Sequence, residues 1–484
     1  MDDLTTIDTI IDSISPRYTA LSDAAWDEPE LRWQEFTAVE NQIAVAEEEG
    51  FTITRDVAAI PTAFMAQKGH GDPIIAVLGE YDGLAELSQA SGIAERIPDP
   101  ANLSGNGQGC GHHLLGAGSL LAASAIARYL EENSIAGTVR YYGCPAEEAA
   151  AGKSFMVKSG AFDDVDAALT WHPNNAMTST QWLSLAYCQA YFRFRGTAAH
   201  AGVSPELGRS ALDALELFNV GVNFLREHMA DSSRIHYAIV DGGGNSPNVV
   251  QPRAAAYYVI RARTVSEMRD LYERVCQVAE GAAIMTGTKV SVEFDGGSSE
   301  ILPNDVLEAA LHRNVEKLGG VSFDEVDQES ARRFTLTIPQ KDLAETRKRL
   351  GMSRFNDSSL FAGVPPVPTR EARPLVHGST DVGDVSWVTP TVQLTGSNWA
   401  IGTPIHSWQS VAQGKLPAAH KGMIYAAKAI AATALDLYTD PQLLKSARHE
   451  FETVVADTPY DCPIPDDVVA PPARAARITT DPVT

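Results

Sequence analysis

Short apolar runs alternate with helical patterns through the first half of the chain. Four runs have the length and composition of buried strands, at 74–78, 139–142, 167–170 and, much later, 391–395. Strands that alternate with helices are typical of a sheet that is covered by helices on both faces. The pattern therefore predicts an α/β fold built on one central sheet.

The segment 185–297 has a different order of elements. Its strand-like and helical stretches follow one another at 185–195 (strand), 210–229 (helix), 235–241 and 254–263 (strands), 266–285 (helix) and 289–294 (strand). The order β-α-β-β-α-β is that of a ferredoxin-like sandwich. We therefore predict a second domain at 185–297, inserted into a catalytic domain whose two parts are 1–184 and 298–458.

Two segments lack a clear period. Residues 332–374 mix charges with Pro365, Pro366 and Pro368, which predicts a loop-rich insertion. Residues 459–484 are rich in proline and small polar side chains, a composition that buries little apolar surface. We expect these last residues to form a mobile or surface-draped tail.

Polar side chains that suit catalysis follow the predicted strands. Because ligands bind outside the carboxyl ends of strands in open α/β sheets, these side chains are expected to meet at one rim. They are Asp82 after the first strand, Glu147 and Glu148 after the second, and His172 after the third. Two further stretches add Cys110 and His112, at the start of an apolar helix, and His406, beyond the fourth strand.

One thiolate, several imidazoles and several carboxylates form the mixed ligand set that zinc prefers, and manganese or cobalt also fit. Two divalent ions accommodate so many ligands better than one, and Cys110 is suited to bridge them. Such a site activates water for hydrolysis. Of the adjacent glutamates, one can bind metal while the other transfers the proton of the water to the leaving nitrogen.

Five short motifs resemble those of a known family. They are Gly-Cys-Gly-His (109–112), Pro-Ala-Glu-Glu (145–148), Trp-His-Pro (171–173), Gly-Thr-Ala-Ala-His-Ala (196–201) and Gly-Ser-Thr-Asp (378–381). They look like those of the dinuclear metallopeptidases that include aminoacylases, carboxypeptidases and indole-acetyl-amino-acid hydrolases. The resemblance covers nearly the whole chain. It implies a catalytic domain with a central mixed sheet and, at 185–297, a lid and dimerisation domain.

The resemblance also implies roles for individual residues. The metal ligands would be Cys110, His112, Glu148, His172 and His406, with Glu147 as general base and Asp82 beside the metals as a support for their ligands. His200 resembles a lid histidine that stabilises the oxyanion in the neighbouring subunit's site. Asn248, Ser379 and Thr380 match positions that touch substrate in relatives. Gln108 and His113 depart from the family pattern beside the Cys-Gly-His core.

Simpler interpretations stay open for several of these residues. A cysteine is often only a small buried hydrophobe, although Cys110 is flanked by glycines and precedes a histidine. Glu147 and Glu148 also suit an ordinary helix start, where acidic side chains favour the helix dipole. Without the resemblance, His406 would be interpreted as a surface residue, and His200 as a loop residue nearly as readily as a catalytic one.

The amino-acid composition limits which classes of partner we expect the protein to bind and where in the cell we expect it. The 62 acidic and 38 basic side chains leave a net charge of -24, which repels nucleic acids and anionic membrane surfaces. The five cysteines show no disulfide spacing, the first residues lack the basic start of a secretory signal, and no apolar run is long enough to span a bilayer. We expect a cytoplasmic protein that binds neither nucleic acid nor membrane.

The first functional hypothesis is a dinuclear metal-dependent amidohydrolase that cleaves an N-acyl or N-aroyl amino acid, with p-aminobenzoyl-glutamate as the reference substrate. Lys153 and Arg263 are suggested as partners for substrate carboxylates. A second hypothesis keeps the metals but changes the reaction to deamination or dechlorination of an aromatic acid. A third is a non-catalytic subunit of a homologous hydrolase. The expected assembly is a homodimer, or a hetero-oligomer with a homologous subunit.

Overall fold

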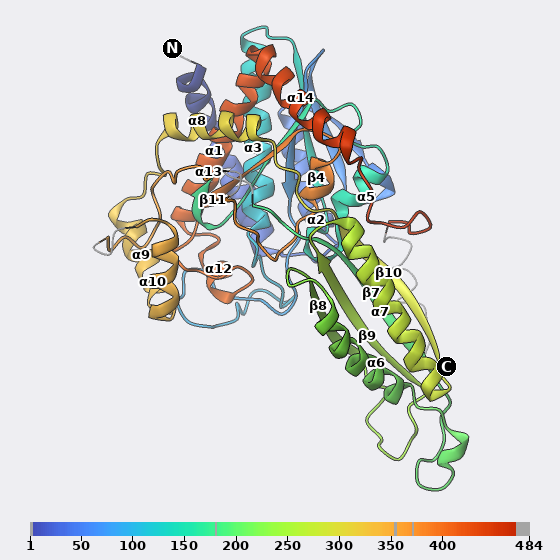
Figure 1. Ribbon diagram of the computed structural model, residues 1–484. Coiled ribbons are helices and arrows are strands. Elements are labelled where there is room, and N and C mark those ends of the chain that lie inside the picture. Colours follow the sequence, from blue (N-terminus) through green and yellow to red (C-terminus); the bar gives the residue numbers. More distant parts are fainter. Residues whose placement is uncertain (1–2, 180–181, 353–355, 370–371, 471–484) are drawn as a thin grey trace.

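The computed structural model describes residues 3–179, 182–352, 356–369 and 372–470. A large body carries a seven-stranded sheet, and an elongated lid with a four-stranded sheet projects from it (Figure 1). The strands are β1 (Thr52–Arg55), β2 (Phe64–His70), β3 (Ile74–Glu80), β4 (Gly137–Cys144), β5 (Ala167–His172), β6 (Asn175–Thr178), β7 (Ala186–Arg195), β8 (Arg234–Asp241), β9 (Arg253–Ala262), β10 (Lys289–Ser298) and β11 (Thr391–Ser397).

The helices of the first half are α1 (Asp3–Asp27), α2 (Phe36–Glu48), α3 (His112–Glu132), α4 (Glu147–Ala150), α5 (Gly152–Lys158) and α6 (Ala211–Leu225). Those of the second half are α7 (Val265–Thr286), α8 (Asp305–Leu318), α9 (Glu325–Thr335), α10 (Gln340–Arg349), α11 (Val382–Ser386), α12 (Trp408–Gln413), α13 (Pro417–Thr439) and α14 (Pro441–Asp457). Short 3₁₀ turns lie at Val57–Ala59, Pro205–Leu207 and Arg226–His228.

The large sheet is mixed, with the order β1-β2-β4-β3-β5-β11-β6. The four predicted strands are confirmed as its centre: β3 pairs in parallel with β4 and β5, and β5 pairs in parallel with β11. The sequence pattern missed β1, β2 and β6, which extend the sheet with antiparallel pairs at its edges. The carboxyl ends of β3, β4, β5 and β11 therefore share one rim.

Successive residues of the central strands belong to two hydrophobic cores, one on each face of the sheet. On β3, Ile75 and Val77 pack with α1, α3 and α13, whereas Ala76 and Leu78 pack on the opposite face with α5 and the base of the lid. Because successive side chains of a strand point to opposite faces, a strand buried on both faces is apolar throughout, as the runs in the sequence are. This arrangement confirms the predicted α/β architecture.

The lid has the strand order β10-β7-β9-β8, with α6 and α7 packed on one face. This is the ferredoxin-like arrangement that the order of elements predicted. On β7, Cys188, Ala190 and Phe192 are buried against the helices, and the alternate residues Tyr187, Gln189 and Tyr191 lie on the other face. The lid sheet therefore has one apolar face and one face of polar and aromatic side chains. The domain boundaries themselves stay predictions.

The prediction of a loop-rich segment at 332–374 is wrong over Gln340–Arg349, which form α10, and the segment begins inside α9. Both helices are strongly charged and bury few side chains, with Leu343 the buried residue of α10. A helix that packs against the body through so few apolar residues has no clear apolar periodicity in its sequence. Residues 353–355 and 370–371 of the segment lie outside the described residues.

The described part of the predicted tail, 459–470, lies on the surface of the body. Lys158 donates to backbone oxygens of Pro465 and Val468, and Arg269 of the lid pairs with Asp461. Ile464 and Val468 are buried. These contacts favour the surface-draped alternative for 459–470, and 471–484 lie outside the described residues.

Among the described residues, none of the helices combines the length and the hydropathy that a membrane span requires. The cytoplasmic location stays a prediction of the sequence.

Candidate active site

Side chains from distant parts of the chain meet at the rim formed by the strand ends. Two groups of ligand-type side chains share Cys110: one adds His112 and His172, the other adds Glu148 and His406. Within each group the ligand atoms lie within 4.8 Å of one another. A side chain common to two groups has the geometry of a ligand shared by two ions.

The Gly-Cys-Gly-His motif turns the chain sharply into α3. Gly111 has a φ of 83°, and a side chain there would meet Trp399 and Pro173 at about 3 Å. Positive φ and close approach together favour glycine at this position. The turn places Cys110 immediately before the helix and His112 as its first residue, so both side chains are directed by a rigid element.

Asp82 orients one residue from each of the two ligand groups, His112 and Glu148. One of its carboxylate oxygens lies 2.8 Å from His112 Nδ1, and the other accepts a hydrogen bond of 2.8 Å from the backbone N–H of Glu148. A carboxylate on Nδ1 fixes the ring orientation and leaves Nε2 free for a metal. Asp82 thus supports the ligand groups without being a member of either.

The two remaining histidines come from different segments of the chain. His172 ends β5, its Nδ1 lies 2.8 Å from the Pro173 carbonyl oxygen, and its Nε2 lies 3.3 Å from Cys110 Sγ. His406 has a left-handed backbone with a φ of 60°, and its Nε2 lies 2.9 Å from a Glu148 oxygen. A non-glycine residue held in this strained conformation is typical of functional sites.

The two glutamates begin α4, a short helix that lies between the left-handed residues Ala146 and Ala151. A Glu147 oxygen lies 3.9 Å from His112 Nε2, so Glu147 faces the ligand groups. Burial, followed by the nearby carboxylates of Glu80 and Glu148, raises the pKa of Glu147 well above its usual value. A carboxylate with a raised pKa is suited to accept a proton.

The donor set fits divalent metal ions. His112 Nε2 and a Glu148 oxygen are buried without a hydrogen-bond partner among the described residues, and both point toward other ligand-type atoms. Buried polar atoms of this kind are costly unless something satisfies them. Thiol, imidazole and carboxylate donors that converge in this way could hold a metal ion, which would satisfy these atoms.

A buried charged cluster underlies the site. Lys153 is fully buried, and its Nζ lies 2.5 Å from Glu80 and 2.7 Å from Asp381. The suggestion that Lys153 binds a substrate carboxylate is therefore wrong, because two protein carboxylates already occupy its ammonium group. Arg263 is exposed beyond the end of β9, where its backbone N–H bonds to Glu267 at the start of α7.

Gln108 and His113 belong to the packing around the helix start. Gln108 accepts from the His113 backbone N–H and donates to the Tyr81 carbonyl oxygen. His113 Nε2 lies 3.1 Å from the Gly414 carbonyl oxygen, and burial lowers the pKa of His113 to about 3. Both side chains bond to backbone groups and belong to neither ligand group, so this departure from the family pattern affects the support of the turn.

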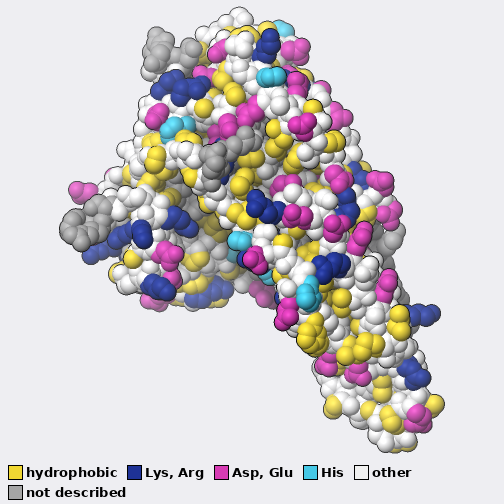
Figure 2. All heavy atoms as spheres, in the orientation of Figure 1, with side chains coloured by type: hydrophobic (Ala, Val, Ile, Leu, Met, Phe, Trp, Pro, Cys, Tyr) yellow, Lys and Arg dark blue, Asp and Glu magenta, His cyan; other side chains and the backbone are white. Residues whose placement is uncertain are grey.

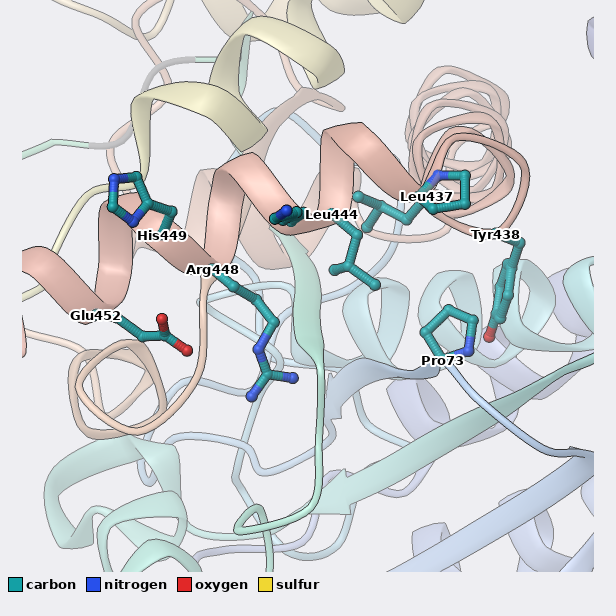
Figure 3. A pocket seen from close by; sticks show the side chains of 9 residues that line it. Pro73, Leu437, Tyr438, Leu444, Arg448, His449 and Glu452 are labelled. Carbon is teal, nitrogen blue, oxygen red and sulfur yellow. The ribbon is translucent and has the colours of Figure 1, made fainter.

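A pocket of about 420 Å³ lies at the other end of the sheet, between α13, α14 and the residue that precedes β3 (Figure 3). Its lining includes Pro73, Tyr438 and Arg448, and Arg448 pairs with Asp166. Because β3 begins there, this pocket lies at the amino ends of the parallel strands. It is separate from the rim that holds the ligand groups.

Comparisons with known proteins agree with this geometry. The model of the peptidase dimerisation domain of the M20 family matches residues 186–283. One subunit of the p-aminobenzoyl-glutamate hydrolase of Escherichia coli is 44% identical over 476 residues, which cover 97% of this chain and 98% of that protein. The chain belongs to the M20 peptidase family. The Xaa-Arg dipeptidase of Mus musculus is 27% identical, covering 91% of this chain and 90% of its own.

A solved structure shares the fold of this M20 hydrolase. A dinuclear metal-binding M20 peptidase of Bacillus subtilis aligns with a TM-score of 0.54 at 16% identity, covering 89% of this chain and 99% of its own. The membership confirms that the chain is a hydrolase with a metallopeptidase fold.

Two predicted residues of the M20 hydrolase lie at the far end of the lid. His200 follows β7 and forms an isolated bridge with Val249, next to Asn248, and both His200 and Asn248 are exposed. The residue of β7 nearest the body is Ala186, and the one nearest His200 is Arg195. Nine steps of about 3.3 Å separate these two residues, which makes the strand about 30 Å long. His200 is thus remote from the ligand groups of its own chain.

Ser379 and Thr380 of the M20 hydrolase lie at the near end of the lid. The Ser379 hydroxyl donates to the Leu185 carbonyl oxygen at 2.6 Å and lies 2.6 Å from an Arg261 nitrogen. Thr380 accepts a hydrogen bond of 3.3 Å from the backbone N–H of Val382. Ser379 therefore already has two protein partners.

Sequence reasoning missed three charged groups of this region: Glu80, Asp381 and Arg261. Glu80 is the last residue of β3, and Asp381 is the last residue of the Gly-Ser-Thr-Asp motif. Both side chains are buried, and a Glu80 oxygen lies 3.2 Å from His112 Nε2. Arg261 lies in a strand that the pattern did predict. Its position on the open face of the lid sheet follows from alternation with buried Ile260 and Ala262, which is the signal that was available.

Proposed function

We propose that this chain hydrolyses the amide bond of an N-acyl or N-aroyl amino acid, with p-aminobenzoyl-glutamate as the reference substrate. The observation that carries the proposal is the convergence of Cys110, three histidines, Glu148 and Glu147 at the rim of the sheet. The name of the Escherichia coli relative supports the reference substrate.

The metal ligands in this proposal are the five side chains of the two groups that share Cys110, namely Cys110, His112, Glu148, His172 and His406. Two zinc or manganese ions, with cobalt as an alternative, fit this mixture of donors. When bound, such ions polarise the scissile carbonyl and lower the pKa of water to about 7. Asp82 keeps His112 Nε2 directed at the site through its contact with Nδ1.

Glu147 performs the proton transfers in the proposed reaction. Its carboxylate takes a proton from the attacking water and returns it to the leaving nitrogen, which departs as an amine. Between the two transfers, the carboxyl group of Glu147 holds the proton. The bond that breaks is the amide C–N bond, and the bond that forms joins the carbonyl carbon to the water oxygen.

The assembly in the proposal is a dimer through the lid, homomeric or with a homologous subunit. On α6, Val220 and Phe224 are 50% and 69% exposed, and on the edge strand β8, Ile239 and Val240 are 53% and 51% exposed. Figure 2 shows hydrophobic side chains gathered on this part of the lid. An exposed apolar edge of a sheet needs a cover, and a second lid supplies one.

The first test is product analysis with metal removal. The purified chain loaded with zinc or manganese is expected to release p-aminobenzoate and glutamate from p-aminobenzoyl-glutamate, and a chelator is expected to abolish this release until metal is restored. Chromatography of the products measures both. Ammonia or halide as the sole product from aromatic acids, or no turnover with full metal content, would contradict the proposal.

The second test addresses His200, which we assign to the oxyanion of the neighbouring subunit's site. Mixed subunits of His200→Ala and Glu147→Gln are expected to recover about one quarter of the parental activity, because half of the dimers are hybrids with one complete site each. Rates before and after subunit exchange measure this. If His200 served its own chain, both sites of a hybrid would be incomplete and exchange would restore nothing.

A further inference from the structure

A surface segment that contains α9 and α10 packs against the loop that carries His406. This α9–α10 segment comprises residues 324–352 and 356–361 and lies beside α12 at the edge of the body (Figure 1). The His406 loop comprises residues 399–406, which follow β11. One buried apolar cluster joins the segment to the loop and to β6, and its members are Ile338, Leu343, Phe361, Ile401 and Ala176. The charged helix α10 is therefore attached to the body next to the candidate site.

The contacts of the segment reach the backbone of the loop. Gly402 has a φ of 87°, and a Cβ atom there would lie 3.2 Å from Ile338 Cδ1 and 3.4 Å from Leu343 Cδ1. The backbone N–H of Ile401 donates to the Ser359 carbonyl oxygen at 2.8 Å. The segment thus constrains the loop four residues before the proposed metal ligand.

Helix α9 holds the Ser359 contact in place. The side-chain oxygen of Gln328, on α9, accepts hydrogen bonds from the backbone N–H groups of Ser359 and Leu360. Leu360 in turn packs with Ala400 of the loop in a second buried cluster. The loop is therefore packed against the segment at three successive residues, 400–402.

The proposed ligands form a His406 group (Cys110, Glu148 and His406) and a His172 group (Cys110, His112 and His172). The side chain of His406 is half exposed and its backbone has a φ of 60°, so packing on the ring is slight and the loop backbone sets where Nε2 lies. By contrast, His172 ends β5, which pairs with a strand on each side, and His112 begins the buried helix α3. The two groups therefore differ in what holds their histidines.

We infer that Leu343 and Ile338 are positioning residues for His406, and that they raise the affinity of the His406 group for its ion. The affinity of the His172 group does not depend on them. This inference rests on the ligand assignment of the proposed function. A loop that shifts carries the imidazole away from the other two ligands of the group, because different parts of the chain hold those ligands.

The test counts the zinc ions that the loaded enzyme retains while a chelator lowers the free zinc concentration. The parental protein is expected to lose its two ions in two steps, which His406→Ala and His172→Ala assign to their groups. Leu343→Ala is expected to move the step of the His406 group to about 10- to 100-fold higher free zinc, the range for groups that orient a metal ligand, and to leave the other step in place. Elemental analysis of the dialysed samples measures the retained zinc.

Matched variants separate positioning from general stability. Leu271, on α7 of the lid, is 5% exposed, and Leu343 is 6% exposed. Leu271→Ala removes the same atoms from a similarly buried position, so it is expected to lower the denaturant midpoint and keep both zinc steps. Leu343→Met keeps the side-chain volume and is expected to restore the parental step. If Leu343→Ala does not fold, Ile338→Val, which removes the Cδ1 atom near the loop, is expected to move the same step in the same direction.

The outcomes distinguish this inference from the proposed function. Zinc steps that stay parental in Leu343→Ala and Ile338→Val, or two steps that move equally, would overturn the inference. Retention of both ions by His406→Ala with parental steps would overturn the ligand assignment and the inference together. A parental enzyme that holds two ions but does not cleave p-aminobenzoyl-glutamate would contradict the proposed function, and the zinc steps would still decide the inference.

Discussion

Replacement of Glu147 with glutamine is expected to lower kcat roughly 10²- to 10⁴-fold, the range that general acid–base catalysis contributes. Glutamine has nearly the same shape, but it cannot take a proton from water or deliver one to the leaving nitrogen. Glu147 is grouped with Glu80 and His112 but is absent from the two groups that share Cys110, which supply the proposed ligands, so metal content is expected to be unchanged. Initial rates and elemental analysis of the same sample measure the two effects.

The adjacent glutamate is the matched control. Glu148 belongs to the group with Cys110 and His406, and Glu148→Gln is expected to lose metal together with activity. The two variants thus separate a proton-transfer defect from a metal-binding defect at neighbouring positions. A Glu147→Gln protein that holds both ions and turns over at the parental rate would remove Glu147 from the mechanism.

Replacement of Lys153 with methionine is expected to destabilise the protein by about 3–5 kcal/mol, because it leaves buried carboxylates without their counter-charge. Glu80 and Asp381 are both nearly or fully buried and contact the ammonium group directly. Burial opposes the charge of Lys153, but Asp381 and Glu80 outweigh burial and raise the pKa of Lys153 well above its usual value. This stabilisation is therefore present at neutral pH and is lost only as the pH rises through the raised value.

The denaturant midpoint and slope of the metal-free protein measure this effect. Lys415→Met removes a surface pair with Asp27 and is expected to cost about 0–1 kcal/mol, which controls for loss of a lysine. Adding Glu80→Gln and Asp381→Asn to Lys153→Met is expected to recover part of the lost stability, since the unpaired charges are removed. Equal stability of Lys153→Met and the parental protein would show that the two carboxylates are protonated or solvated without the lysine.

Local patterns were sufficient for much of the fold. The apolar runs at 74–78 and 167–170 became β3 and β5, since strands buried on both faces must be apolar at every position. The order of elements at 185–297 was sufficient to predict a ferredoxin-like sheet. Helix α10 was missed because a charged helix with one buried leucine has no apolar face to read.

For the candidate site, too, the sequence predicted some features correctly and not others. The rule that strand ends share a rim, together with the family motifs, predicted that Cys110, His172 and His406 lie together, and the structure brings them together. The roles of these residues remain proposals. The suggested substrate partners were predicted poorly: Lys153 is paired inside the protein, and Arg263 is exposed beyond the end of β9. Lysine and arginine side chains are long, so their partners depend on which chain segments pack nearby.

The sequence by itself determined the class of fold, the order of elements in the lid and the kinds of donor atom at the rim, because periodicity, strand ends and side-chain chemistry are local properties. Only the tertiary structure decided which charges are paired, which carboxylate orients His112, and that His200 lies beyond the far end of a strand about 30 Å long. These features depend on distances between segments that are far apart in the chain. Packing of the whole molecule sets such distances.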